Sequence, residues 1–339
     1  MSRALEIDIF RGLNILEMEN TESCDDSFFD HASYDDMKMN YADTIFPCFS
    51  FISGMLLKRD KVVPARKSIQ LIGLGMAFNS VPMLLENEKF RPLGVLQRHG
   101  LSSIILNNLV PINFRNSVLF PLAMSGLWLA VSFGHATDKS KPFDNQEHTA
   151  QQKIDSIFFG GRTYHENFDP EGLLGSFMTS VTIWSGYWFM QQNLSNLHSF
   201  LAGAGFLGAG YLVSKVFPAH FPVSKPLWTP AFALTSNGWS ILKYLAVKNA
   251  IPYLPSLVKN LLAIVGKQSM EVYFLGEILL LISKYEFTEN TSIWKMAQSG
   301  LNKIFSSAIT KTILTLTFDI SLVGFAYWCN ANGWKIRLL

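Results

Sequence analysis

The sequence has few cysteines and few charges, and each shortage excludes a class of protein. Its 339 residues include only Cys24, Cys48 and Cys329, whose wide spacing fits neither a disulfide framework nor a metal site. Charged residues make up 16% of the chain and the net charge is +2, which gives no reason to expect nucleic-acid binding. The sequence also lacks a glycine-rich phosphate loop, an internal repeat and any low-complexity tract.

Hydrophobic residues are abundant, at 49% of the chain, and they arrive in blocks. Several blocks approach the roughly 20 apolar residues that a helix needs to cross a bilayer. We therefore expect an all-α fold, a polytopic transmembrane bundle of about ten helices that forms one membrane domain over residues 1–339. The expected spans are residues 5–19, 42–57, 68–85, 93–111, 116–134, 171–190, 194–213, 227–247, 257–283 and 304–328.

The charged loops orient these spans. The connector at 58–67 is strongly basic, whereas the segment at 22–36 is acidic. Positive loops stay in the cytoplasm, so the acidic segment is expected on the opposite side. Alternation then predicts that both termini face the cytoplasm and that the polar loop at 135–169 lies on the lumenal or external side.

Polar and ionisable residues are concentrated in and between the first two spans. An ionisable side chain costs roughly 2.5 to 3.5 kcal/mol at the centre of a bilayer, so several in one short region indicate a pathway or a reaction site. The residues concerned are Arg3, Asp8, Arg11, Asn20, His31 and Asp43.

These residues belong to a series of blocks that resembles the heparan-alpha-glucosaminide N-acetyltransferase family. The blocks occur in the family's order and cover nearly the whole expected membrane region. They are RALEIDIFRG at 3–12, Asn20, HASY at 31–34, ADTIFPCFSFISG at 42–54, GVLQR at 94–98, FDPEGLLG at 168–175, PVSKPLWT at 222–229 and GKQSMEVY at 266–273.

The resemblance implies a membrane acetyltransferase that moves an acetyl group from cytoplasmic acetyl-CoA to the amine of a lumenal amino sugar, with no metal. It also implies a homodimer in a lysosomal or vacuolar membrane. By the same resemblance, His31 matches the histidine assigned to catalysis, and Asn20 matches an asparagine that assists it.

The chemistry gives an independent reason for a histidine. An amine attacks a thioester only when unprotonated, and an imidazole, whose ordinary pKa is near 6.5, can accept the proton. An imidazole can also carry the acetyl group itself, so direct transfer and a covalent route both stay open. Asn20 could orient the imidazole or donate to the thioester oxyanion.

Three residues near these positions have alternative interpretations. Asp8 and Arg11 lie three apart on one helical face, so they form either an architectural ion pair or part of the site. Asp43 opens the second span and is either its N-terminal cap or a partner of His31 that fixes the tautomer and raises the basicity.

Later matched blocks supply four further candidates for substrate or CoA binding. Arg98 could neutralise a CoA phosphate or pair with an internal carboxylate. Asp169 and Glu171 flank a proline at the start of a span, where they either cap the helix or shape the acceptor site. Trp228 either lines the site or belongs to the core.

Two other functions stay open. A transporter of a small polar solute would carry the same intramembrane charges, although such proteins often have repeated halves, which this sequence lacks. A family member that has kept the scaffold but lost transfer is suggested by Glu17 and Glu19, which interrupt a normally apolar stretch of the first helix.

Overall fold

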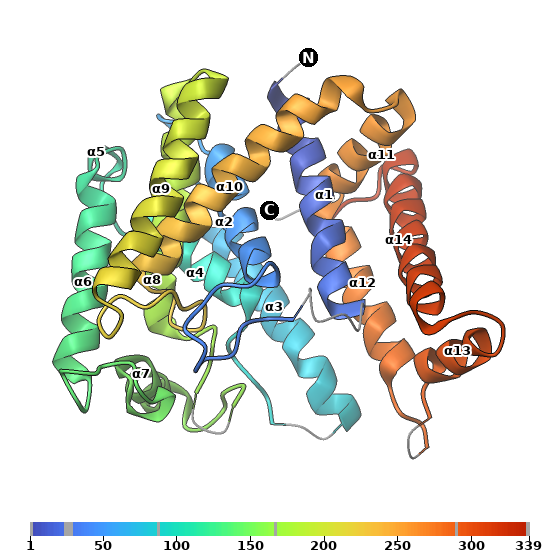
Figure 1. The fold of residues 1–339 in the computed structure, drawn as a ribbon, viewed down its shortest axis with the longest axis horizontal. Helices are drawn as coiled ribbons and strands as arrows, with labels where there is room; N and C mark the ends of the chain where they lie inside the picture. The colour runs from blue at the N-terminus through green and yellow to red at the C-terminus, as the bar shows by residue number, and fades with distance from the viewer. Residues whose placement is uncertain (1–2, 24–29, 87–88, 166–167, 289–290, 337–339) are drawn as a thin grey trace. The chain divides into compact units, whose positions relative to one another are not determined.

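The computed structural model describes residues 3–23, 30–86, 89–165, 168–288 and 291–336, and these are α-helices joined by loops (Figure 1). The predicted all-α class is confirmed, since no β-strand occurs among the described residues. The α-helices are α1 (Arg3–Ser23), α2 (Ile45–Met55), α3 (Ala65–Glu86), α4 (Val95–Asn107), α5 (Ile112–Arg115), α6 (Leu119–His135), α7 (Ala150–Phe159), α8 (Leu173–Gln192), α9 (Asn196–Val216), α10 (Pro230–Ala250), α11 (Ser256–Lys267), α12 (Ser269–Lys284), α13 (Ile293–Asn302) and α14 (Ser307–Ala331).

The chain forms two compact units that are interleaved in sequence. Unit 1 comprises Met1–His31, Asn40–Ile45 and Ala246–Arg337, and unit 2 comprises Ala32–Met39, Phe46–Leu245 and Leu338–Leu339. The boundary between the units falls within α10, between Leu245 and Ala246, and each unit holds its own share of the predicted site residues.

In unit 1, α1 packs against α11, α12 and α14 (Figure 1). The crossing of α1 and α11 depends on two glycines. A Cβ atom at Gly12 would lie 2.0 Å from the carbonyl oxygen of Leu262, and one at Gly266 would lie 1.9 Å from that of Asp8. No side chain fits at such distances, so glycine at both positions lets the two backbones touch.

In unit 2, α8 packs against α4, α6 and α7, and α3 packs against α4. The α2 and α8 backbones also meet at glycines, because a Cβ atom at Gly54 would lie 1.8 Å from the carbonyl oxygen of Ile183. Aromatic side chains fill the core around fully buried Trp228, whose ring lies 5.3 Å from that of Phe46 and 5.2 Å from that of Phe232. These edge-to-face contacts are favourable beyond the area that they bury.

Among the described residues, two helices, α9 and α14, are long and apolar enough to cross a membrane, so the expected bundle of about ten spans is not confirmed. Both expose large apolar side chains, among them Phe200 and Leu212 on α9 and Leu316 and Ile320 on α14. The segment expected as one span at 257–283 consists of two helices, α11 and α12. Gln268, with φ −106° and ψ 28°, separates α11 from α12 there, because its backbone leaves the helical region.

The segment at 135–169, which the sequence predicts to be a polar loop, contains the helix α7. The hydroxyl of Thr149 accepts a hydrogen bond from the backbone N–H of Gln152 and caps the start of α7. Gly160 ends the helix with φ 57°, a left-handed conformation that suits glycine. The hydrophobic pattern of this ten-residue helix is too short to stand out from the polar residues around it.

Candidate functional site

His31 and Asp43 form a side-chain pair in unit 1. The Nδ1 atom of His31 lies 2.8 Å from Oδ1 of Asp43. The Asp43 side chain is 1% exposed and the His31 side chain is 46% exposed, so the aspartate is fixed while the imidazole is accessible. A carboxylate that accepts from Nδ1–H selects the tautomer in which Nε2 carries the lone pair, which is the arrangement of a general base.

The loop geometry explains why Asp43 faces the histidine. Asp43 lies in a short 3-10 turn, Ala42–Thr44, directly before α2. Its second oxygen, Oδ2, accepts from the backbone N–H of Asn40 at 2.9 Å, and the Asn40 side chain donates to the carbonyl oxygen of Asp30 at 3.1 Å. Asn40 thus ties the residue before His31 to the turn that carries Asp43. Of the two alternatives for Asp43, the contacts are those of a histidine partner.

Asn20 lies on α1 and pairs with a residue that the sequence analysis did not select. Its Nδ2 donates to Oδ2 of Asp319 on α14 at 3.4 Å. The two remaining oxygens, Oδ1 of Asn20 and Oδ1 of Asp319, are buried and have no hydrogen-bond partner among the described residues. Asn20 therefore belongs to a polar contact between α1 and α14.

Asp8 and Arg11 form the ion pair that their spacing allows, at 2.9 Å between Oδ1 and Nη2. The Nε atom of Arg11 also donates to the carbonyl oxygen of Gly266 on α11. Both charged groups are thus used at the glycine crossing of α1 and α11. Their contacts are architectural.

In unit 2, Asp169 and Glu171 bind one arginine, Arg91. The Nε and Nη2 atoms of Arg91 donate to the two oxygens of Asp169 at 2.8 and 2.6 Å, and Nη2 also binds Glu171. Burial alone would lower the pKa of Arg91, but these carboxylates raise it. Asp169 also accepts from the backbone N–H groups of Tyr164 and Glu171, so it holds the turn before α8 together.

Arg98 and Trp228 are neighbours in the same unit. The guanidinium of Arg98 lies 5.0 Å from the centre of the Trp228 ring, a cation–π contact. Its Nη2 atom donates to the carbonyl oxygen of Gly172 at 3.4 Å, and the side chain is 1% exposed. The Trp228 indole donates to the hydroxyl of Thr182 at 3.2 Å. Both side chains are part of the core around the start of α8.

Asp155 on α7 is a buried carboxylate that the sequence analysis missed. Its Oδ1 accepts from the backbone N–H of Leu173, the first residue of α8, at 3.0 Å. Asp155 therefore caps α8, the role that the sequence suggested for Asp169 and Glu171. Burial, together with the nearby charge of Asp169, raises the pKa of Asp155 to about 7.

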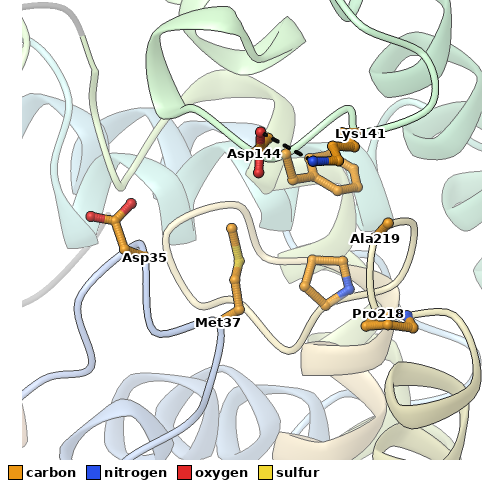
Figure 2. Close-up of a pocket in the computed structure, with 8 residues that line it drawn as sticks. Asp35, Met37, Lys141, Asp144, Pro218 and Ala219 are labelled. Carbon is orange, nitrogen blue, oxygen red and sulfur yellow. Dashed lines mark ion pairs between the residues drawn. The ribbon is translucent and has the colours of Figure 1, made fainter.

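A pocket of about 400 Å³ lies among the loops of unit 2. Figure 2 shows Asp35 and Met37 from one loop, Lys141 and Asp144 from a second, and Pro218 and Ala219 from a third. The Lys141 ammonium lies 3.9 Å from a carboxylate oxygen of Asp144. None of the predicted site residues lines this pocket.

The structure thus brings the predicted residues into four groups. His31 meets Asp43, Asp8 meets Arg11, Asp169 meets Glu171 through Arg91, and Arg98 meets Trp228, whereas Asn20 meets Asp319. Among the described residues, no group of three or more histidine, cysteine, aspartate or glutamate side chains is arranged to hold a metal. Arg91, Asp155 and Asp319 carried no motif, although an aspartate within an apolar run such as 304–328 is a signal that singles out Asp319.

No family model matches the chain, and no curated protein is significantly similar to it.

Proposed function

We propose that this protein is a transmembrane acetyltransferase that moves an acetyl group from cytoplasmic acetyl-CoA to the amine of a lumenal amino sugar. The observation that supports the proposal most is the pair formed by exposed His31 and buried Asp43. An oriented imidazole backed by a carboxylate is the arrangement used by enzymes that activate a nucleophile for acyl transfer. The resemblance of the sequence blocks supports the same reaction.

The proposed reaction balances as follows in the direct route. The amine nitrogen attacks the thioester carbonyl carbon, a C–N bond forms, and the C–S bond to CoA breaks. Nε2 of His31 accepts the proton that the amine loses, and Asp43 stabilises the imidazolium that forms. The proton then passes to the departing thiolate, so that free CoA leaves as a thiol.

In the covalent route, Nε2 of His31 attacks the thioester first and holds the acetyl group, and CoA leaves. The amine then attacks the acetyl carbon, the bond from that carbon to Nε2 breaks, and Nε2 takes the proton that the amine loses. Solvent removes this proton and protonates the CoA thiolate, which restores the histidine. Asp43 has the same orienting role in both routes. Asn20 is proposed to assist at the acceptor, and acetyl-CoA is a substrate rather than a resident cofactor.

The proposed setting is a multi-pass bundle of about ten spans in a lysosomal, vacuolar or other endomembrane, with both termini in the cytoplasm. The spanning lengths of α9 and α14 support a membrane location. The basic connector at 58–67 and the acidic segment at 22–36 support the orientation. In this orientation His31 follows the lumenal end of the first span, the side from which the acceptor arrives.

The test is acetyl transfer by the purified full chain in detergent or sealed vesicles. With labelled acetyl-CoA and a panel of amines that includes glucosamine, we expect label to appear in an N-acetylated product. Release of CoA without any amine acceptor would indicate the covalent route or hydrolysis. Binding of acetyl-CoA without transfer to any amine would favour a catalytically degenerate protein, and uptake of amine without acetyl-CoA would favour a transporter.

A further inference from the structure

A second cavity, of about 620 Å³, lies in unit 1 along one face of α14. Its lining residues on α14 recur every three or four positions, so they form a single stripe along the helix. Asn20 of α1 contributes from the other side. The polar lining residues are Asn20, Ser307, Lys311, Thr312, Thr315 and Asp319.

Asn20 and Asp319, which line this groove, each have a side-chain oxygen that accepts no hydrogen bond from the described residues. Nδ2 of Asn20 donates a hydrogen bond to Oδ2 of Asp319 at 3.4 Å. The Oδ1 atom of each residue is buried and has no hydrogen-bond partner among the described residues. A buried acceptor without a donor costs about 1 to 3 kcal/mol, and such groups are uncommon in folded proteins. The two acceptors belong to side chains that contact each other, and one is on a carboxylate, so they fit a group that donates several hydrogen bonds and is positively charged.

The position of Asp319 within α14 is costly for a charged side chain. Helix α14 is long and apolar enough to span a bilayer, and an ionisable residue within such a helix usually serves a ligand, an ion or a proton. Lys311 and Asp319 are eight residues apart, about 12 Å along the helix axis. Between these two charges the groove presents the hydroxyls of Thr312 and Thr315.

We propose that this groove binds the acceptor amine before transfer, with its ammonium at Asp319 and Asn20 and its hydroxyl-bearing body along Thr315 and Thr312. An ammonium supplies three donors, which matches the two buried oxygens and the negative charge of Asp319. In the orientation inferred from the charged loops, Ser307 begins the span on the lumenal side, so the groove leads from that side toward Asp319. This inference rests on the proposed function, because it assigns a binding site to the acceptor of that reaction.

The inference is tested by binding of glucosamine to the purified full chain, measured by calorimetry without acetyl-CoA. N-acetylglucosamine is the matched ligand, since it keeps the sugar hydroxyls and lacks the ammonium. We expect glucosamine to bind more tightly than N-acetylglucosamine. We also expect Asp319→Asn to raise the Kd for glucosamine at least about tenfold, because it removes the charge and keeps the shape of the side chain.

Two further variants keep the test decisive. Thr317→Ala changes an exposed hydroxyl on the same helix outside the groove, and it should bind glucosamine like the wild type. Thr315→Met fills the groove and leaves both charges in place, so it should also weaken binding. It supplies the test if Asp319→Asn fails to fold. Equal affinity for the two sugars, or wild-type affinity in both groove variants, would overturn the inference.

Acetyl transfer distinguishes this inference from the proposed function. If the wild type transfers acetyl groups while Asp319→Asn keeps its KM for the amine, the groove assignment is wrong and the enzymatic proposal stands. If the wild type binds glucosamine through Asp319 but never acetylates it, the groove assignment stands and the enzymatic proposal fails.

Discussion

The Nδ1 atom of His31 lies 2.8 Å from Oδ1 of Asp43, and the backbone N–H of Asn40 holds the other oxygen of the same carboxylate at 2.9 Å. The loop itself therefore fixes the aspartate. The imidazole that it orients is about half exposed. In the proposed reaction, the imidazole would need no rearrangement before it accepts a proton.

Replacing the carboxylate of this pair tests its role. We expect Asp43→Asn to lower kcat for acetyl transfer by about 10²- to 10⁴-fold with little change in KM, because the amide no longer enforces the tautomer or stabilises the imidazolium. The matched control is Asp36→Asn, an exposed loop aspartate paired with Lys38 at 3.2 Å, which should leave kcat unchanged. Full activity in Asp43→Asn would mean that the carboxylate only shapes the loop.

Asp155 predicts a pH dependence of stability. Its pKa is raised from 3.8 to about 7 by burial, so the folded state holds a proton that the unfolded chain has lost between these two pH values. Stability from the neutral carboxyl is complete below the unfolded pKa and is lost as the pH rises through about 7. We expect the wild type to lose up to about 4 kcal/mol over this range relative to Asp155→Asn.

The measurement is the melting temperature of both proteins from pH 5 to 8.5, taken as the difference at each pH. Asp138→Asn is the control, because the hydrogen bonds to Ser140 lower the pKa of Asp138 and its titration is complete below this range. The melting temperature of the wild type should fall relative to that of Asp155→Asn as the pH rises. Relative to Asp138→Asn it should stay constant. A constant difference for Asp155→Asn would show that this carboxyl is already ionised in the fold.

The ion pairs of Arg91 separate an architectural role from a substrate-binding role. Asp169 is fully buried and takes two hydrogen bonds from Arg91, so Asp169→Asn should destabilise the protein by about 3 to 5 kcal/mol. Glu171→Gln should cost less, because Arg91 keeps both bonds to Asp169. Thermal melting measures both effects. A normal melting temperature with a raised KM for acetyl-CoA in Asp169→Asn would instead assign this residue to the substrate.

The glycine crossing of α1 and α11 makes a steric prediction. Gly12→Ala would place a Cβ atom 2.0 Å from the carbonyl oxygen of Leu262, so we expect the helices to separate and stability to fall by about 1 to 3 kcal/mol or more. Gly300 on α13 has nothing within 4 Å of the same position, and Gly300→Ala should be neutral or stabilising by up to about 1 kcal/mol. Equal melting temperatures for the two variants would contradict this packing.

Long helices such as α9 and α14 could be predicted from the sequence, because each corresponds to one continuous apolar run. The run at 194–213 corresponds to α9 at Asn196–Val216, and the run at 304–328 corresponds to α14 at Ser307–Ala331. The break at Gln268 was not predicted, since no proline marks it, although Lys267, Gln268 and Ser269 interrupt the apolar run there. Helix α7 was missed because a short amphipathic helix resembles a polar loop.

The side-chain partners were harder to predict. His31 and Asp43 are twelve residues apart in one segment, so their pairing was one of two alternatives for Asp43. Asn20 and Asp319 are 299 positions apart, and Arg91 and Asp169 are 78 apart. Periodicity carries no information about which helices pack together, and these contacts follow from that packing.

The acetyl-transfer rate of His31→Ala measures most directly whether His31 takes part in catalysis. His148→Ala is its matched control, because His148 is also exposed and lies outside the site. With saturating acetyl-CoA and glucosamine, we expect His31→Ala to lose at least about 10²-fold in rate with an unchanged melting temperature, while His148→Ala keeps the wild-type rate. A wild-type rate in folded His31→Ala would contradict a catalytic role for His31.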